Sequence, residues 1–213
     1  MDTGEWRVYE WAGLTLRVYT HPCVYEPSDD SRLAVEALAA AYERWGRVPV
    51  AVDLGSGTGI LGLAVHEIYG AHVVAVDLNP WAVEASAKTL AGKGSVARCN
   101  WGSCIASRVG LAVSNPPYLP VGGELGECGG WLEKAWSHGR SSVERACREA
   151  ARLAPRVVLV YSSLSGFDVE SCLESLGYTI ILRLEERFFM ERLYAIAAEE
   201  RGVGSPQARA GRD

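Results

Sequence analysis

A short proline-containing stretch, Asn115-Pro116-Pro117-Tyr118, is the part of this sequence best suited to hold a reactive group. It follows the apolar run 109–113, which predicts a buried strand. Two successive prolines prevent a strand or a helix from continuing, so the chain must turn there in a fixed, extended way. Such a turn can hold an amide side chain, a backbone carbonyl and an aromatic ring around a planar NH2 group. A proline-rich turn without any catalytic role has the same pattern.

A second pattern, upstream, joins acidic residues to a glycine-rich loop. The apolar run 48–52 leads into Asp53 and the loop, and an apolar helix is expected after it. The glycines of the loop are Gly55, Gly57 and Gly59. Glycines let the backbone pass close to a ligand. The next predicted strand, 72–76, ends in Asp77, whose carboxylate can accept both hydroxyls of a ribose. Together these features predict a nucleoside site.

The glycine spacing and the charge of Asp53 favour S-adenosyl-L-methionine over a nicotinamide dinucleotide. The dinucleotide fingerprint needs its third glycine one place later than Gly59. Asp53 would repel a pyrophosphate, whereas it would attract the cationic amino-acid part of the methyl donor. These two features disfavour a dehydrogenase. In the alternative interpretation, Asp53 only binds backbone amides of the loop.

Strands and helices alternate along the chain, which predicts an α/β fold with a mostly parallel sheet. We expect its strands near 48–52, 72–76, 96–99, 109–113, 156–161, 178–186 and 188–198. The last two lack a helix between them, so the sheet should have seven strands with an antiparallel last strand. Ligands bind such sheets at the carboxyl ends of the strands, so both motifs should face one crevice.

The composition is that of an ordinary globular protein, with 213 residues that are 48% hydrophobic and 22% charged. We expect one domain over residues 1–199, beginning with a β-hairpin extension within residues 1–22, and a disordered tail over residues 200–213. The net charge of −5 argues against a large nucleic-acid surface. No signal-peptide pattern and no apolar run of membrane-spanning length is found, so we expect a cytoplasmic protein without a membrane partner.

The six cysteines are scattered: Cys23, Cys99, Cys104, Cys128, Cys147 and Cys172. None forms a Cys-x-x-Cys pair, which argues against a zinc site, and no metal is expected. In a cytoplasmic chain most of them would be free, small core residues. Disulfides are the alternative for a protein from a hyperthermophile, and the sequence does not decide between the two.

These motifs resemble those of the HemK-like glutamine methyltransferases, in the eukaryotic and archaeal branch of that family. The loop 53–59 with Asp77 resembles the first two motifs of class I methyltransferases, and the turn 115–118 resembles that of enzymes methylating amide or amino nitrogen. Residues 24–31 and 135–140 are similar to this branch in particular. The resemblance covers about residues 20–198 and implies a Rossmann-like class I methyltransferase. Such enzymes modify the Gly-Gly-Gln glutamine of peptide chain release factors.

The resemblance also implies a role for each site residue. Those near the donor, or its product S-adenosyl-L-homocysteine, would be Ser31, Asp53, Gly55, Gly57, Asp77, Asn100, Trp101 and Asn115. Asp53 and Gly55 would line the amino-acid end of the donor, and Asp77 would hold its ribose. Asn100 stands where the family usually has an acid that accepts the adenine amine, and its carbonyl can still accept that bond. A small zinc-binding activator subunit, forming a heterodimer, is a further partner implied by the family.

In this interpretation the residues that bind the substrate amide are Asn115, Pro116, Pro117 and Tyr118. The Asn115 side-chain oxygen and the Pro116 carbonyl would accept the two amide hydrogens, aim the nitrogen lone pair at the methyl group and stabilise the charge that develops. Tyr118 would stack on the planar amide, which makes Asn115, Pro116 and Tyr118 the catalytic residues.

Two alternatives stay open. A nucleic-acid amino methyltransferase, acting on N6-adenine or a similar base, would use the same turn on a flipped-out base. It would need phosphate contacts, which the acidic net charge disfavours. A non-catalytic donor-binding scaffold would not need the Asn115–Tyr118 turn.

Overall fold

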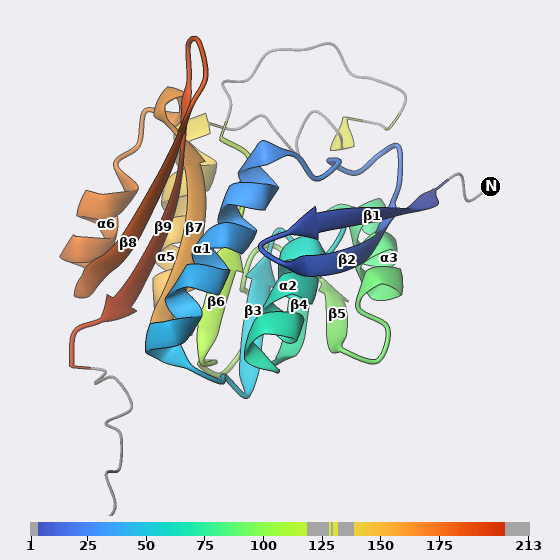
Figure 1. Cartoon of the computed structure of the whole chain (residues 1–213), viewed down its shortest axis with the longest axis horizontal. Coiled ribbons are helices and arrows are strands. Elements are labelled where there is room, and N and C mark those ends of the chain that lie inside the picture. The colour runs from blue at the N-terminus through green and yellow to red at the C-terminus, as the bar shows by residue number, and fades with distance from the viewer. Residues whose placement is uncertain (1–3, 119–127, 129, 132–138, 203–213) are drawn as a thin grey trace, which may run out of the picture.

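The computed structural model describes residues 4–118, 128, 130–131 and 139–202 (Figure 1). The described strands are β1 Glu5–Trp11, β2 Leu14–Thr20, β3 Val50–Leu54, β4 His72–Asp77, β5 Gly94–Arg98, β6 Leu111–Ser114, β7 Arg156–Ser162, β8 Tyr178–Arg187 and β9 Arg192–Glu200. The described helices are α1 Asp29–Trp45, α2 Ile60–Tyr69, α3 Pro80–Thr89, α5 Gly139–Leu153, the 3-10 helix η1 Ser163–Ser165 and α6 Val169–Ser175.

Seven of these strands form one mixed sheet with the order β5-β4-β3-β6-β7-β9-β8. Strands β3 to β7 pair in parallel, and β9 lies antiparallel between β7 and β8. The predicted seven-stranded sheet with an antiparallel last strand is therefore confirmed. Strands β1 and β2 form a separate two-stranded hairpin, as the sequence also predicts.

Helices cover both faces of the sheet. Apolar side chains of α1 and α2 pack with one face in the first hydrophobic cluster, and those of α5 and α6 pack with the other face in a second cluster. Figure 1 shows the resulting layers, with α1 and α2 in front of the strands and α5 behind them. Among the described helices, none has the length and apolar character needed to cross a membrane.

The N-terminal hairpin packs beside α3. Tyr19 of β2, with Val24 just beyond it, forms a small buried cluster with Ala82 and Ala85 of α3. The Tyr19 backbone N–H also donates to Thr89 Oγ1 at 3.0 Å. These contacts fix the start of the segment that leads into α1.

The boundaries differ from the sequence-based ones mainly at the last strand. Sequence alternation predicts a strand from residue 188, but β9 starts at Arg192, and the exposed residues 188–190 form the β8–β9 turn. The Phe188 N–H donates to the Glu191 carbonyl at 2.8 Å and closes this turn. Residues 203–213 of the predicted tail lie outside the described residues, and Glu200, its first residue, ends β9. Most of the loop predicted after Tyr118 and most of the short helix predicted near residues 131–136 also lie outside the described residues.

The expectation that most cysteines are free is wrong. The structure pairs Cys23 with Cys128, Cys99 with Cys104 and Cys147 with Cys172, at Cα–Cα distances of 5.3, 6.0 and 6.8 Å. The sequence could not show this because two of the three pairs bridge segments that only the fold brings together. The Cys147–Cys172 bridge joins the two helices α5 and α6, and Cys23–Cys128 spans 105 residues.

Candidate functional site

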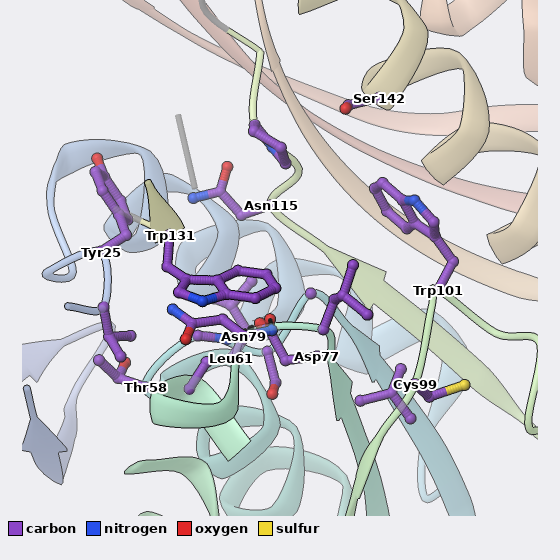
Figure 2. Close-up of a pocket in the computed structure, with 18 of the residues that line it drawn as sticks. Tyr25, Thr58, Leu61, Asp77, Asn79, Cys99, Trp101, Asn115, Trp131 and Ser142 are labelled. Atoms are coloured by element: carbon purple, nitrogen blue, oxygen red, sulfur yellow. Dashed lines mark hydrogen bonds between the residues drawn. The ribbon is translucent and has the colours of Figure 1, made fainter. Parts of the chain in front are cut away.

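A cavity of about 400 Å³ lies where the carboxyl ends of β3, β4, β5 and β6 meet (Figure 2). The site residues predicted from the sequence that line its walls are Ser31, Gly55, Gly57, Asp77, Asn100, Trp101, Asn115 and Pro117. The parallel pairing explains this, since parallel strands present their carboxyl ends at the same edge of a sheet. Asp53, Pro116 and Tyr118, the other chosen residues, do not line the cavity.

The glycine loop takes backbone conformations that favour glycine. Gly55, Gly57 and Gly59 have φ angles of 72°, 54° and 81°, in the left-handed region where a side chain is strained. The N–H groups of Gly55 and Ser56 both donate to the Val76 carbonyl, at 2.9 and 3.0 Å. These bonds hold the loop against the end of β4, beside Asp77.

Asp77 ties the glycine loop to the start of α3. Its Oδ2 accepts from the Gly57 N–H and its Oδ1 accepts from the Asn79 N–H, each at 2.9 Å. Burial raises the pKa of this carboxyl, and the bonds from the Gly57 and Asn79 N–H groups oppose that effect. Each carboxylate oxygen can accept a further bond, and the binding of two ribose hydroxyls by Asp77 stays a prediction.

Asp53 is almost fully buried, with 1% of its surface exposed, directly behind the glycine loop. Its Oδ2 accepts from the Gly62 N–H at 2.8 Å, and this N–H belongs to the first turn of α2. Its Oδ1 is buried without a described hydrogen-bond partner. Burial, with a smaller contribution from the charge of Asp77, raises the pKa of Asp53 to about 7. Asp53 therefore caps α2, and its contact with the donor stays a prediction.

The turn that follows β6 lies beside the glycine loop. The Ser114 hydroxyl donates to the Leu54 carbonyl at 2.7 Å, which joins the carboxyl ends of β6 and β3. Asn115 lines the cavity, and its side-chain oxygen is buried without a hydrogen bond from any described residue. Pro116 is buried, and Pro117 contributes to the cavity wall. An unsatisfied buried acceptor in a cavity wall is suited to bind an N–H group of a ligand.

The last residue of the turn, Tyr118, points to the amino end of α1. Its ring packs against both hydrophobic clusters, and its hydroxyl donates to Asp30 Oδ2 at 2.8 Å. Tyr25, which lines the cavity, donates its hydroxyl to the same oxygen at 3.1 Å. Burial and then the charge of Asp30 raise the pKa of both tyrosines. Stacking of Tyr118 on a substrate amide stays a prediction.

The loop after β5 carries Asn100 and Trp101. The disulfide Cys99–Cys104 closes this loop, and the Cys104 N–H donates to Cys99 Sγ at 3.0 Å. Trp101 has a φ of 54°, which is uncommon for a bulky residue. The loop thus presents an uncharged amide and an indole to the cavity.

Several cavity residues were not identified from the sequence. They are Asn79 after β4, Trp131, and Ser142 and Arg145 on α5. In Figure 2 the Trp131 indole projects into the cavity, with Asn115 on one side of it in this view and Asp77 on the other. Asn79 could have been found from its place two residues after Asp77, but nothing in the sequence places Trp131 or α5 at this cavity.

Three buried, unsatisfied oxygens lie in or behind the cavity wall, and their chemistry suits a ligand such as S-adenosylmethionine. Asp53 Oδ1, Ser56 Oγ and Asn115 Oδ1 are buried and have no described hydrogen-bond partner. A Cβ added at Gly55 would meet nothing within 4 Å, so the loop leaves open space there. An ammonium, a sulfonium and ribose hydroxyls are groups that such oxygens attract or bind.

The family follows from a comparison of the sequence with family models. The model for the methyltransferase small domain matches residues 15–124, more than half of the 213 residues. The chain belongs to this family. The methyltransferase small domain match includes the glycine loop, Asp77 and the turn 115–118.

Individual relatives confirm the resemblance to HemK-like proteins. Methyltransferase HEMK2 of Homo sapiens is 33% identical in an alignment 138 residues long, and the match covers 57% of this chain and 60% of that protein. The release factor glutamine methyltransferase of Deinococcus radiodurans is 36% identical over 125 residues, covering 56% of this chain and 42% of the relative. The chain thus spans 60% or less of the length of these relatives.

A solved structure confirms the fold. The 16S rRNA N2 G1207 methyltransferase of Thermus thermophilus, in complex with AdoMet and guanosine, aligns with a TM-score of 0.68 at 20% identity. The alignment covers 93% of this chain and 51% of that protein. At this level of identity the likeness establishes a Rossmann-like methyltransferase fold.

Proposed function

We propose that this protein is an S-adenosylmethionine-dependent N-methyltransferase that methylates the glutamine amide in the Gly-Gly-Gln loop of a peptide chain release factor. The observation that carries the proposal is the buried, unsatisfied Asn115 side-chain oxygen in a cavity wall beside the glycine loop. The name of the release factor glutamine methyltransferase relative supports the same reaction and substrate, and the name of the HEMK2 relative supports methyl transfer.

The donor would lie across the carboxyl ends of the parallel strands. Asp77 would bind the ribose, Gly55 and Gly57 would let the donor approach the backbone, and Asn100 with Trp101 would hold the adenine. Ser31 lines the same cavity and would lie near the donor. Asp53 would act on the amino-acid end through its charge, from behind the loop. When bound, the donor supplies an electrophilic methyl group on a sulfonium.

The substrate amide would bind at the turn. An amide nitrogen is a poor nucleophile because its lone pair is delocalised. The Asn115 oxygen and the Pro116 carbonyl would accept its two hydrogens, fix the lone pair in line with the methyl group and stabilise the positive charge developing on nitrogen. Correct placement of two bound reactants can supply roughly 7–11 kcal/mol of the barrier. The reaction needs neither a metal nor a covalent intermediate in this scheme.

The choice of a protein substrate over a nucleic-acid base rests on charge and on the relatives. The chain has a net charge of −5, and a nucleic-acid enzyme needs cations for phosphate contacts. Methylation of a base is the alternative, because the fold is shared with an rRNA methyltransferase. A small zinc-binding activator subunit would be a partner of this protein, as the resemblance to the HemK-like branch implies.

A methyl-transfer assay with S-adenosylmethionine tests the proposal. Its acceptors are a release factor, the same factor with its loop glutamine changed to alanine, and structured RNA. We expect a mass gain of one methyl group only on the unchanged factor, with the activator subunit supplied. Transfer to RNA alone would refute the protein-glutamine assignment and support base methylation.

The variant Asn115→Ala tests the role of the turn. Loss of one charge-stabilising hydrogen bond typically lowers kcat on the order of 10²–10³-fold, and we expect a loss of this size. Donor affinity, measured by calorimetry, should change little because the remaining donor residues are intact. An equal loss of donor affinity would contradict this separation of donor and substrate sites.

A further inference from the structure

The carboxylate of Asp30 has no role in the reaction described above, although it is buried next to the cavity. It is 3% exposed and lies in the first turn of α1. No ion pair joins it to an arginine or lysine in the described part of the chain. A charged group so placed is expensive to bury unless hydrogen bonds satisfy it, so its partners show what it does.

Four donors converge on the two oxygens of this carboxylate. Oδ2 accepts from the hydroxyls of Tyr118 at 2.8 Å and Tyr25 at 3.1 Å. Oδ1 accepts from the backbone N–H of Ser31 at 2.6 Å and from its hydroxyl at 3.2 Å. The positive end of the α1 dipole adds to the stabilisation of the negative charge.

These hydrogen-bond donors come from both parts of the proposed site, the wall of the cavity and the turn that follows β6. Ser31 and Tyr25 are part of the cavity wall, whereas Tyr118 ends the turn that we propose to hold the substrate. Between Tyr118 and Asn115 stand only the two prolines, which fix the backbone and leave little freedom between the two side chains. Placement of the Tyr118 hydroxyl is thereby transmitted to the Asn115 amide.

We propose that Asp30 is a positioning residue for methyl transfer: by holding the Tyr118 hydroxyl, it fixes the Asn115–Tyr118 turn relative to the donor wall formed by Tyr25 and Ser31. The inference rests on the proposed function, because it assigns the turn to the methyl acceptor. Asp30 itself does not line the cavity, so it would act through these neighbours.

The variant Asp30→Asn tests this role with little change of shape. Its carboxamide has one acceptor oxygen where the carboxylate has two, so it cannot satisfy both the tyrosines and Ser31. A misplacement of about 1 Å can cost on the order of 10²-fold in rate, and we expect kcat to fall 10- to 100-fold on this basis. Donor affinity should stay at the wild-type level.

Two further variants separate positioning from a general effect on folding. Tyr118→Phe keeps the charge of Asp30 and removes one hydrogen bond to it. In the Tyr118→Phe protein, the additional change Asp30→Asn should lower kcat far less than the same change does in the wild-type protein. Tyr161→Phe is the matched control, because Tyr161 of β7 donates its hydroxyl to Glu170 of α6 at 3.2 Å and does not line the cavity. We expect this control to keep wild-type kcat.

Hydrogen exchange of the turn gives a readout that does not depend on the acceptor. Peptides spanning residues 113–118 should exchange faster in Asp30→Asn and in Tyr118→Phe than in the wild type, and at the wild-type rate in Tyr161→Phe. Unchanged exchange, or independent effects of Asp30→Asn and Tyr118→Phe on kcat, would overturn the inference. A wild-type protein that methylates RNA instead would refute the proposed substrate alone, and the same variants would then be measured with RNA.

Discussion

The buried carboxyl of Asp53 makes the stability of this protein depend on pH in a direction that can be worked out. Its pKa is about 7 in the folded protein, against an ordinary value of 3.8. At a pH between these two pKa values, Asp53 keeps its proton in the folded chain and has lost it in the unfolded chain. Stability therefore falls as pH rises through this window and levels off above about pH 7.

The size of the effect follows from the two pKa values. A rise from 3.8 to about 7 corresponds to about 4 kcal/mol of destabilisation when the folded group is fully ionised. The penalty is about 2 kcal/mol at pH 5 and about 4 kcal/mol at pH 8. Asp53 is only 1% exposed, so solvent does little to screen this effect.

The variant Asp53→Asn removes this titration and keeps the bond from the Gly62 N–H, which its carbonyl can accept. Its NH2 group would take the place of the unpartnered Oδ1, at a cost of about 1–3 kcal/mol for a buried, unsatisfied group. The free energy of unfolding of the variant, relative to that of the wild type, should rise by about 2 kcal/mol from pH 5 to pH 8. Its donor affinity should decrease, since a negative charge near the ammonium is lost.

Urea unfolding at several pH values, followed by tryptophan fluorescence, measures the difference between the two proteins. Asp168→Asn is the matched control, because Asp168 caps α6 and the bonds from Ser171 lower its pKa. This group is ionised in both states from pH 5 to 8, so its difference from the wild type should stay constant there. If the free energies of unfolding of the wild type and of Asp53→Asn depended on pH in the same way, the proposed titration of Asp53 would be refuted.

Three other perturbations have expected outcomes of their own. Replacing Cys23 and Cys128 by serine removes a bridge across 105 residues, and the free energy of unfolding should fall by about 4–5 kcal/mol in denaturant titrations under non-reducing conditions. Gly59→Ala puts a side chain at a φ of 81° and within 3.0 Å of Ser86 Cβ, so the melting temperature should drop, with a loss on the order of 1–3 kcal/mol. Tyr69→Phe removes a buried hydroxyl that donates at 2.7 Å to a backbone carbonyl of α1, which should cost about 1–3 kcal/mol by the same titration. An unchanged stability of any of these variants would contradict the contact behind it.

The fold could be predicted because its signals are local. Apolar runs followed by Asp53, Asp77 and Asn115 mark three strand ends, and parallel pairing then brings these ends to one edge. The ligands themselves stay proposals, but the cavity lies where the motifs indicate.

The rest depends on contacts between distant parts of the chain. Asp30 reads as a residue of a helix start, and its bond to Tyr118, 88 positions away, exists only in the fold. The pairing of the cysteines and the place of Trp131 in the cavity are of the same kind. No periodicity or spacing rule describes such pairs.

The disulfide Cys23–Cys128 also has a topological consequence. Together with the backbone between them, the two cysteines close a covalent ring that contains Asp30, the glycine loop, Asp77 and the Asn115–Tyr118 turn. A single break of the backbone within this ring divides the chain into two fragments, and the disulfide still joins them. Both halves of the site would therefore stay on one molecule after a proteolytic nick, until the bridge is reduced.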